Sequence, residues 1–227
     1  MPSRKKSSMF GCAFGSCVGS FVVICVALAT PHWASSQERF SRPNGSVTIS
    51  LGYGLFRGTC EQFVDAGLQV SQTTFQVADA LSGTTSRGLT VATIAVLVLA
   101  LLCSLLSSGF TCTNTVSNPY QTFLGPLGVY TWNSSCGVLT LLAMILFPVN
   151  VQGSSLSREL AHGCSSSLQT HLSSQHTYGY SYWILLLVIA LNIASFLVIY
   201  FYDHATYSRK KEQERPIENA PKDVILF

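Results

Sequence analysis

Hydrophobic residues gather in four long stretches that contain no Asp, Glu, Lys or Arg, and polar residues fill the segments between them. The stretches cover residues 9–30, 89–110, 123–149 and 180–202. A helix needs about 20 mainly apolar residues to cross the hydrocarbon core of a bilayer. Such a helix satisfies its own backbone groups where no water can do so. The pattern predicts an all-α membrane protein, a bundle of four transmembrane helices.

The positions of the basic residues predict how the chain crosses the membrane. A run of three precedes the first stretch and another run of three follows closely after the last: Arg4, Lys5, Lys6, Arg209, Lys210 and Lys211. Basic residues near a span favour the cytoplasmic side, so both termini are predicted to be cytoplasmic. The segments between the helices are then a cytoplasmic N-terminus (1–8), an extracellular loop (31–88), a cytoplasmic loop (111–122), a second extracellular loop (150–179) and a cytoplasmic tail (203–227).

A competing interpretation treats the first stretch as a cleaved signal peptide, because Ala27-Leu28-Ala29 has the small residues of a cleavage site. Signal peptides usually have an apolar region of about 7–15 residues, and this region is longer. A first membrane span is therefore favoured. Cleavage would leave the remaining topology unchanged.

Composition agrees with a membrane protein and excludes several functions. The chain is 48% hydrophobic and 10% charged, with a mean hydropathy of +0.38, whereas soluble domains carry about 25% charged residues. The net charge of +3 is too small and too dispersed to indicate nucleic-acid binding. The charge-free spans argue against a proton relay or a voltage sensor. No phosphate-binding loop, zinc-protease helix or nucleophile elbow occurs, so no enzyme activity, cofactor or small-molecule substrate is expected.

One group of residues in the second extracellular loop could be drawn as a metal site. It consists of His162, Cys164, His171 and His176. Their spacing fits no compact tetrahedral motif, and the serines around them are typical of a flexible loop. We therefore expect no metal there.

Small residues along the first span predict close helix packing. Gly11, Gly15 and Gly19 recur every four residues, so they lie on one side of the helix. Helices in lipid associate through close backbone approach, and the favoured interpretation is a seam inside the bundle. Contact with a second copy or with another membrane protein is the alternative. Aromatic residues at the span ends predict an anchoring belt: Trp33, Tyr180, Tyr182, Trp183, Tyr200 and Tyr202.

The first extracellular loop carries a glycosylation sequon and a strand pattern. Asn44-Gly45-Ser46 matches the sequon, although Pro43-Asn44-Gly45 is also a turn signal. The alternation in Val47–Leu51 predicts a strand, and Tyr53–Gly58 is a candidate second strand. We expect a small antiparallel β-element that lies on the helix bundle.

The predicted topology divides the eight cysteines into two groups. Cys60 and Cys164 alone face the oxidising compartment, one in each extracellular loop. A disulfide between them would join the loops, and two free or intermolecular thiols are the alternative. Cys12 and Cys17 lie near the inner edge of the first span and are candidates for palmitoylation, or else ordinary helix residues.

The C-terminal tail has the composition of a disordered segment. From Ala205 onward it is polar, charged and interrupted by Pro216 and Pro221. It ends in Ile225-Leu226-Phe227. An apolar residue beside a free carboxylate suits the groove of a PDZ domain, so a cytoplasmic PDZ scaffold is a candidate partner.

Several motifs are shared with one family. The most specific are Tyr53-Gly54-Leu55-Phe56-Arg57-Gly58 and the run from Asn118 to Tyr130. The end of the first span, Thr30-Pro31-His32-Trp33, and the segments 104–110 and 223–227 fit as well. Together they resemble the clarins, four-pass proteins distantly related in layout to claudins and tetraspanins. The resemblance runs nearly from end to end.

The loop also resembles claudins in Trp33, in Gly54-Leu55-Phe56 and in Cys60, with two departures. Phe56 stands where claudins have tryptophan, and Cys60 is the only cysteine in the loop. A claudin-type disulfide within the loop is therefore excluded.

The clarin resemblance implies an integral plasma-membrane protein without enzyme activity, and some clarins are associated with hearing and actin-rich protrusions. Our leading hypothesis is a noncatalytic organiser that joins the lipid bilayer and other membrane proteins to a cytoplasmic PDZ or actin-associated scaffold. The alternative is an auxiliary subunit of an ion channel or transporter.

Overall fold

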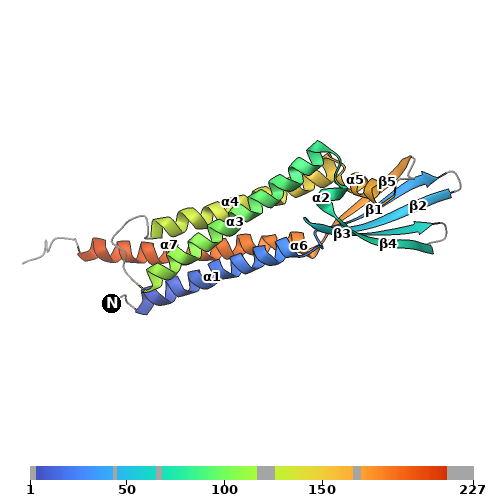
Figure 1. The fold of residues 1–227 in the computed structure, drawn as a ribbon. Coiled ribbons are helices and arrows are strands. Elements are labelled where there is room, and N and C mark those ends of the chain that lie inside the picture. Colours follow the sequence, from blue (N-terminus) through green and yellow to red (C-terminus); the bar gives the residue numbers. More distant parts are fainter. Residues whose placement is uncertain (1–3, 43–44, 65–67, 117–125, 166–169, 214–227) are drawn as a thin grey trace, which may run out of the picture.

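The computed structural model has two parts, a bundle of long helices and a β-sheet that extends from one end of it (Figure 1). The structure describes residues 4–42, 45–64, 68–116, 126–165 and 170–213. The start of the first helix and the end of the last described helix lie at the end of the bundle far from the sheet.

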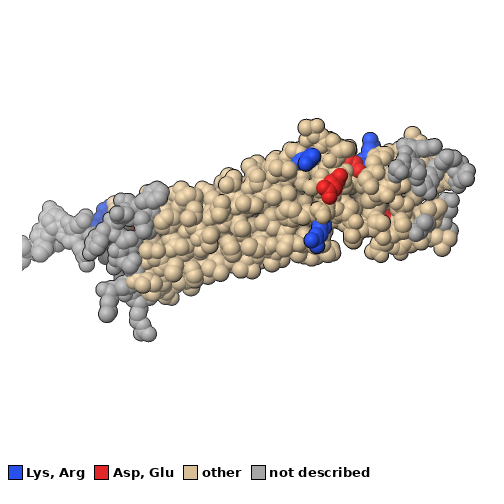
Figure 2. Space-filling model, viewed as in Figure 1, with Lys and Arg blue, Asp and Glu red and all other residues tan. Residues whose placement is uncertain are grey.

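Four helices form the bundle: α1 (Arg4–Ala29), α3 (Thr84–Val116), α4 (Pro126–Pro148) and α7 (Leu185–Gln213). All four are long and apolar enough to cross a membrane. Helices α1 and α4 each pack against both α3 and α7, so the four form a ring. Figure 2 shows that the visible face of the bundle carries no charge along most of its length. The prediction of four membrane-spanning helices is confirmed.

The helices extend beyond the apolar stretches. Helix α7 continues to Gln213, so disorder beginning at Ala205 is wrong for the residues up to 213. After α4 the chain forms a π-helical turn, η1 (Val149–Gly153). Asn150 in this turn donates from Nδ2 to the Ser86 carbonyl at 3.1 Å and to Thr90 Oγ1 at 2.8 Å. These bonds fix the end of α4 to the start of α3.

The sheet is antiparallel and five-stranded, in the order β4-β3-β2-β1-β5. Four strands come from the segment between α1 and α3: β1 (Ala34–Arg42), β2 (Gly45–Tyr53), β3 (Arg57–Val64) and β4 (Leu68–Gln76). The fifth, β5 (His171–Tyr178), comes from the segment between α4 and α7. The antiparallel β-element predicted from the sequence is confirmed, and it is larger than expected.

Short helices connect the sheet to the bundle. Helix α5 (Leu156–Cys164) packs on β1 and β2, α2 (Val77–Ala80) follows β4, and α6 (Tyr180–Trp183) leads into α7. The alternating residues of β2 that face α5 are buried: Val47, Ile49, Leu51 and Tyr53. An antiparallel sheet commonly has one packed face and one solvated face. The opposite face of this sheet is accordingly polar.

Two predictions for these segments are wrong. Tyr53–Gly58 is not a second strand, because the chain turns there and the Gly54 N–H donates to the Arg57 carbonyl at 2.9 Å. A Cβ at position 54 would lie 2.7 Å from the Pro31 Cα atom, so this turn sits directly on the end of α1. The segment 150–179 is also more than a flexible loop, because it contains η1, α5 and β5.

Trp33 joins the sheet to the bundle instead of anchoring in the membrane surface. Its side chain is fully buried, its Nε1 donates to the Ala27 carbonyl at 2.7 Å, and its ring centroid lies 5.0 Å from that of Phe147. Its backbone N–H donates to Tyr53, and its carbonyl accepts from Gly179. The belt prediction is therefore wrong for Trp33. It is also wrong for the buried Tyr182, whereas three of the predicted residues are about half exposed: Tyr180, Trp183 and Tyr200.

Candidate functional site

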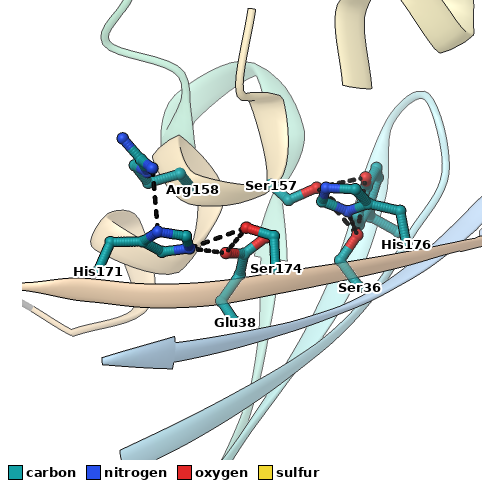
Figure 3. A network of polar contacts seen from close by, with 8 residues as sticks. Ser36, Glu38, Ser157, Arg158, His171, Ser174 and His176 are labelled. Atoms are coloured by element: carbon teal, nitrogen blue, oxygen red, sulfur yellow. Dashed lines mark hydrogen bonds and ion pairs between the residues drawn. The ribbon is translucent and has the colours of Figure 1, made fainter. Parts of the chain in front are cut away.

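A carboxylate lies buried beneath α5, at the junction of β1 and β5 (Figure 3). His171 Nε2 lies 2.7 Å from Glu38 Oε2, and Ser174 Oγ donates to the same oxygen at 2.6 Å. On the other side of the imidazole, Arg158 Nη2 lies 3.0 Å from His171 Nδ1. Because a guanidinium only donates, this geometry fits a neutral His171 whose Nε2 carries the proton. Glu38 Oε1 is buried without a hydrogen-bond partner among the described residues.

A second polar group lies on the same face, nearer the bundle (Figure 3). Ser36 Oγ is 2.9 Å from both Ser157 Oγ and His176 Nδ1, and Tyr53 Oη is 2.9 Å from Ser157 Oγ. Burial raises the pKa of Tyr53 above its usual range, so its hydroxyl stays protonated and available as a donor. These bonds connect β1, β2, β5 and α5 within a buried layer. Satisfied buried networks of this kind make a packing arrangement specific.

Neither group has the geometry of a catalytic triad. A triad histidine contacts the nucleophile through one ring nitrogen and the orienting carboxylate through the other. Here Ser174 and Glu38 both approach Nε2 of His171, at 2.8 and 2.7 Å. The His171 group therefore lacks the triad arrangement, and in the second group no described carboxylate contacts His176; both groups connect β1 with β5 and α5.

The described residues include no cluster of three or more His, Cys, Asp or Glu side chains that could hold a metal ion. The four residues considered above serve separate contacts. His162 packs edge-on against Phe40, with ring centroids 5.4 Å apart, whereas His171 and His176 belong to the two polar groups. Cys164 lies next to Cys60 instead.

The two predicted disulfide partners come together at the edge of the buried layer. Cys60 on β3 and Cys164 at the end of α5 are free thiols that hydrogen-bond to each other. This hydrogen bond, and then burial, raises the pKa of Cys60, and the same hydrogen bond lowers the pKa of Cys164. Gln62 Nε2 also donates to the Cys164 carbonyl at 3.3 Å. The structure thus brings together the two loops that the sequence placed on one side, and the disulfide itself stays a prediction.

The glycine line of α1 faces away from the bundle along most of its length. A Cβ added at Gly11 or Gly15 would meet no described atom within 4 Å, and one at Gly19 would meet Leu191 at 3.3 Å. An internal seam is therefore wrong for Gly11 and Gly15. Other residues of α1 are buried against α3 and α7: Ala13, Cys17, Ser20, Ile24 and Ala27.

The two cysteines predicted as acylation sites differ in exposure. Cys12 is exposed, whereas Cys17 is buried in the bundle. Cys17 Sγ lies 3.3 Å from Ser107 Oγ and 3.6 Å from Ser195 Oγ. Palmitoylation of Cys17 is therefore wrong, because no room exists for an acyl chain, and palmitoylation of Cys12 stays a prediction.

Polar residues near Cys17 also link α4 to α7. Asn133 Nδ2 donates to the Asn192 carbonyl at 2.6 Å, and Asn192 Nδ2 donates to the Val188 carbonyl at 2.9 Å. Asn192 Nδ2 also donates to Cys136 Sγ of α4 at 3.5 Å, so these polar groups connect two spans. Two further predictions lie outside the described residues: glycosylation of Asn44 and docking of Ile225-Leu226-Phe227.

Comparison with known proteins agrees with the four helices and the sheet. The family model described as "Clarin-2: Clarin-2-like" matches residues 5–199. Clarin-3 of Homo sapiens is 47% identical over 229 residues and Clarin-3 of Mus musculus is 44% identical over 227 residues, each alignment covering 100% of both chains. Clarin-2 of Homo sapiens is 29% identical over 209 residues, covering 88% of this chain and 89% of the relative. The chain belongs to the clarin family.

Proposed function

We propose that this clarin is a noncatalytic organiser in the plasma membrane. Its sheet binds neighbouring membrane proteins outside the cell, and its tail docks on a PDZ scaffold in the cytoplasm. The observation that carries the proposal is the open face of the sheet, the face opposite α5. A shallow hollow of about 150 Å³ on this face is lined by amide, hydroxyl and guanidinium groups: Gln37, Arg39, Thr48, Ser173 and Gln175.

The edges of the sheet support the same proposal. Strands β4 and β5 are the edge strands, and each is paired on one side only. An open edge strand presents a row of N–H and C=O groups to which another chain can add. A partner could therefore bind both the open face and an adjoining edge.

The interior of the bundle supports a role without transport chemistry. Among the described residues buried in the four spanning helices there is no Asp, Glu, Lys or Arg. Ion and proton pathways usually need such groups. Several buried polar side chains hydrogen-bond to neighbouring helices or to their own helix backbone, as Asn133, Ser104 and Thr140 do, whereas Ser20 Oγ is buried without a partner among the described residues. The clarins are also not a known family of enzymes.

An added glycan tests the open face. Thr48→Asn places an asparagine two residues before Ser50 on β2 and so creates a glycosylation sequon there. A glycan at this position would cover the hollow. We expect a glycosidase-sensitive mobility shift and at least a several-fold loss of membrane partners recovered by proximity labelling. Thr48→Gln, which creates no sequon, is the matched control and should retain them.

Two results would contradict the proposal. A glycosylated Thr48→Asn protein with undiminished partner recovery would reject the open face as the binding surface. A Thr48→Asn protein that receives no glycan would reject the placement of the sheet outside the cell. A third result would favour the auxiliary-subunit alternative. In that case one channel or transporter is recovered as the partner, and its current changes when the two proteins are coexpressed.

A deletion tests the docking tail separately. Removing Ile225-Leu226-Phe227 should reduce recovery of a PDZ scaffold in detergent pull-downs at least tenfold, because the groove binds the terminal carboxylate and the last side chain. The amount of protein at the cell surface should stay the same. Equal scaffold recovery with the full and the shortened tail would reject docking while leaving the open face untouched.

A further inference from the structure

A hollow of about 400 Å³ lies where the sheet meets the bundle, on the side of α3. One wall is the turn between β2 and β3, with Leu55, Phe56 and Arg57. The facing wall is the beginning of α3, with Arg87, Val91 and Ile94. The hollow thus combines two guanidinium groups with an apolar floor.

The start of the charge-free stretch of α3 predicts that the hollow lies where lipid headgroups meet hydrocarbon. The charge-free stretch of α3 begins at Leu89, so Arg87 lies just beyond it, whereas Val91 and Ile94 lie within it. Figure 2 shows basic and acidic residues together at the junction between the uncharged bundle and the sheet. The Phe56 side chain on the opposite wall is 49% exposed, so its apolar ring is accessible to a lipid.

The two arginines have no acidic partner within the described parts of the chain. Both are exposed, and among the described residues the one close contact between a carboxylate and a basic side chain is that of Glu38 with His171. The residues that line the hollow include no Asp or Glu. A guanidinium matches the oxygen atoms of a phosphate group through paired hydrogen bonds. The charge of the hollow therefore favours an anion, and its floor favours a hydrocarbon chain.

We propose that this hollow binds an anionic phospholipid from the leaflet next to the sheet. The phosphate lies between Arg57 and Arg87, and one acyl chain runs along Val91 and Ile94. A net anionic headgroup is favoured over choline, because the lining offers no carboxylate to a quaternary ammonium group.

Native mass spectrometry of the purified full chain tests the site. The protein is incubated in detergent with equal amounts of dioleoyl phosphatidylglycerol and dioleoyl phosphatidylcholine, and the retained lipids are counted. We expect preferential retention of phosphatidylglycerol. Each of Arg57→Gln and Arg87→Gln should lower the retention of phosphatidylglycerol about fivefold. This is the fold-change expected from the loss of one basic residue next to an anionic lipid.

The control is Arg39→Gln, which removes the same charge from the open face of the sheet. It should change retention less than twofold. All of these positions are exposed, so the variants are expected to fold, and circular dichroism with size-exclusion chromatography checks this. Equal loss in Arg39→Gln and Arg87→Gln would overturn the proposal, because general charge would then explain the binding.

A second variant separates a lipid from a free phosphate ion. Val91→Trp fills the apolar floor and leaves both arginines in place. For a lipid site, this change lowers phosphatidylglycerol retention, and millimolar inorganic phosphate does not displace the lipid. If the tryptophan has no effect and inorganic phosphate displaces the lipid, the hollow is a phosphate site and the lipid proposal fails.

Discussion

Replacing Trp33 by alanine is expected to lower the free energy of unfolding by about 3–5 kcal/mol, the range for a large buried aromatic side chain. The indole fills the junction between sheet and bundle, where its ring packs against Phe147 and Tyr182. Its loss also leaves the Ala27 carbonyl without its 2.7 Å donor. The Ala27 carbonyl then keeps only the longer 3.4 Å bond from Thr30 Oγ1, and this weakened hydrogen bonding adds to the packing loss, which places the variant at the upper end of the range.

The measurement is the midpoint of thermal unfolding in detergent, with circular dichroism as the signal. At about 2–4 °C for each kcal/mol in a chain of this size, the midpoint should fall by on the order of 10 °C. Trp183→Ala is the matched control, since the Trp183 side chain is 52% exposed and its loss creates no cavity. Its midpoint should fall by only a few degrees.

A third variant separates packing from hydrogen bonding. Trp33→Phe keeps most of the ring volume and removes the Nε1 donor, so its midpoint should lie between those of the wild type and Trp33→Ala. Equal shifts for Trp33→Ala and Trp183→Ala would show that the junction does not depend on the buried indole.

The role of Trp33 also shows where sequence reasoning ends. The four spans were predictable because lipid offers no hydrogen-bond partner to the backbone. A long apolar segment that crosses the membrane therefore forms a helix, which satisfies its own backbone groups. A tryptophan at the end of such a span indicates a membrane-surface anchor. Its burial depends on Phe147 and Tyr182, which lie far away in the sequence. Periodicity along the chain carries no information about such contacts.

The sheet was predictable in part for a related reason. In strand β2 every second residue is apolar and faces α5, and this alternation predicts the strand from the sequence. Strand β5 directs Ser174 and His176 toward the same layer, because their partners there are Glu38 and Ser36. Inward-facing polar residues remove the alternation on which strand prediction relies. The buried polar groups and β5 were therefore missed together, and β1, β3 and β4 were not predicted either.

The glycine line shows a third limit. Helix α1 offers two lines of mostly small residues, one with Gly11 and Gly15 and one with Ala13, Cys17 and Ser20. Either line would permit close approach of another helix. The second line is the one buried in the bundle, and this choice is made by the neighbouring helices.

Removing the cysteine pair is expected to cause the second large loss of stability, but only under oxidising conditions. The thiols of Cys60 and Cys164 already contact each other, so a disulfide needs little movement of the backbone. The lowered pKa of Cys164 favours its thiolate, the form that attacks a disulfide donor. A second attack by Cys60 on the mixed disulfide then forms the bridge and releases the reduced donor. The bridge would join β3 to the end of α5.

A bridge between positions 60 and 164 closes a loop of about 100 residues. Such bridges typically stabilise a protein by about 2–4 kcal/mol, mainly by restricting the unfolded chain. The double variant Cys60→Ser/Cys164→Ser should therefore unfold several degrees below the wild type without reductant. With reductant the wild type should fall to nearly the same midpoint, because the bridge is then open.

The control is Cys12→Ser/Cys112→Ser, which removes two exposed thiols and should unfold like the wild type in both conditions. Intact-mass analysis after alkylation tests the bridge directly. Cys60 and Cys164 should escape alkylation in the oxidised wild type and react after reduction. If both cysteines are alkylated before reduction, the two thiols are free in the mature protein. The two chain segments are then held together without a covalent bond, by the pairing of β1 with β5, the buried polar layer and the Gln62 contact, and reductant should leave the unfolding midpoint unchanged.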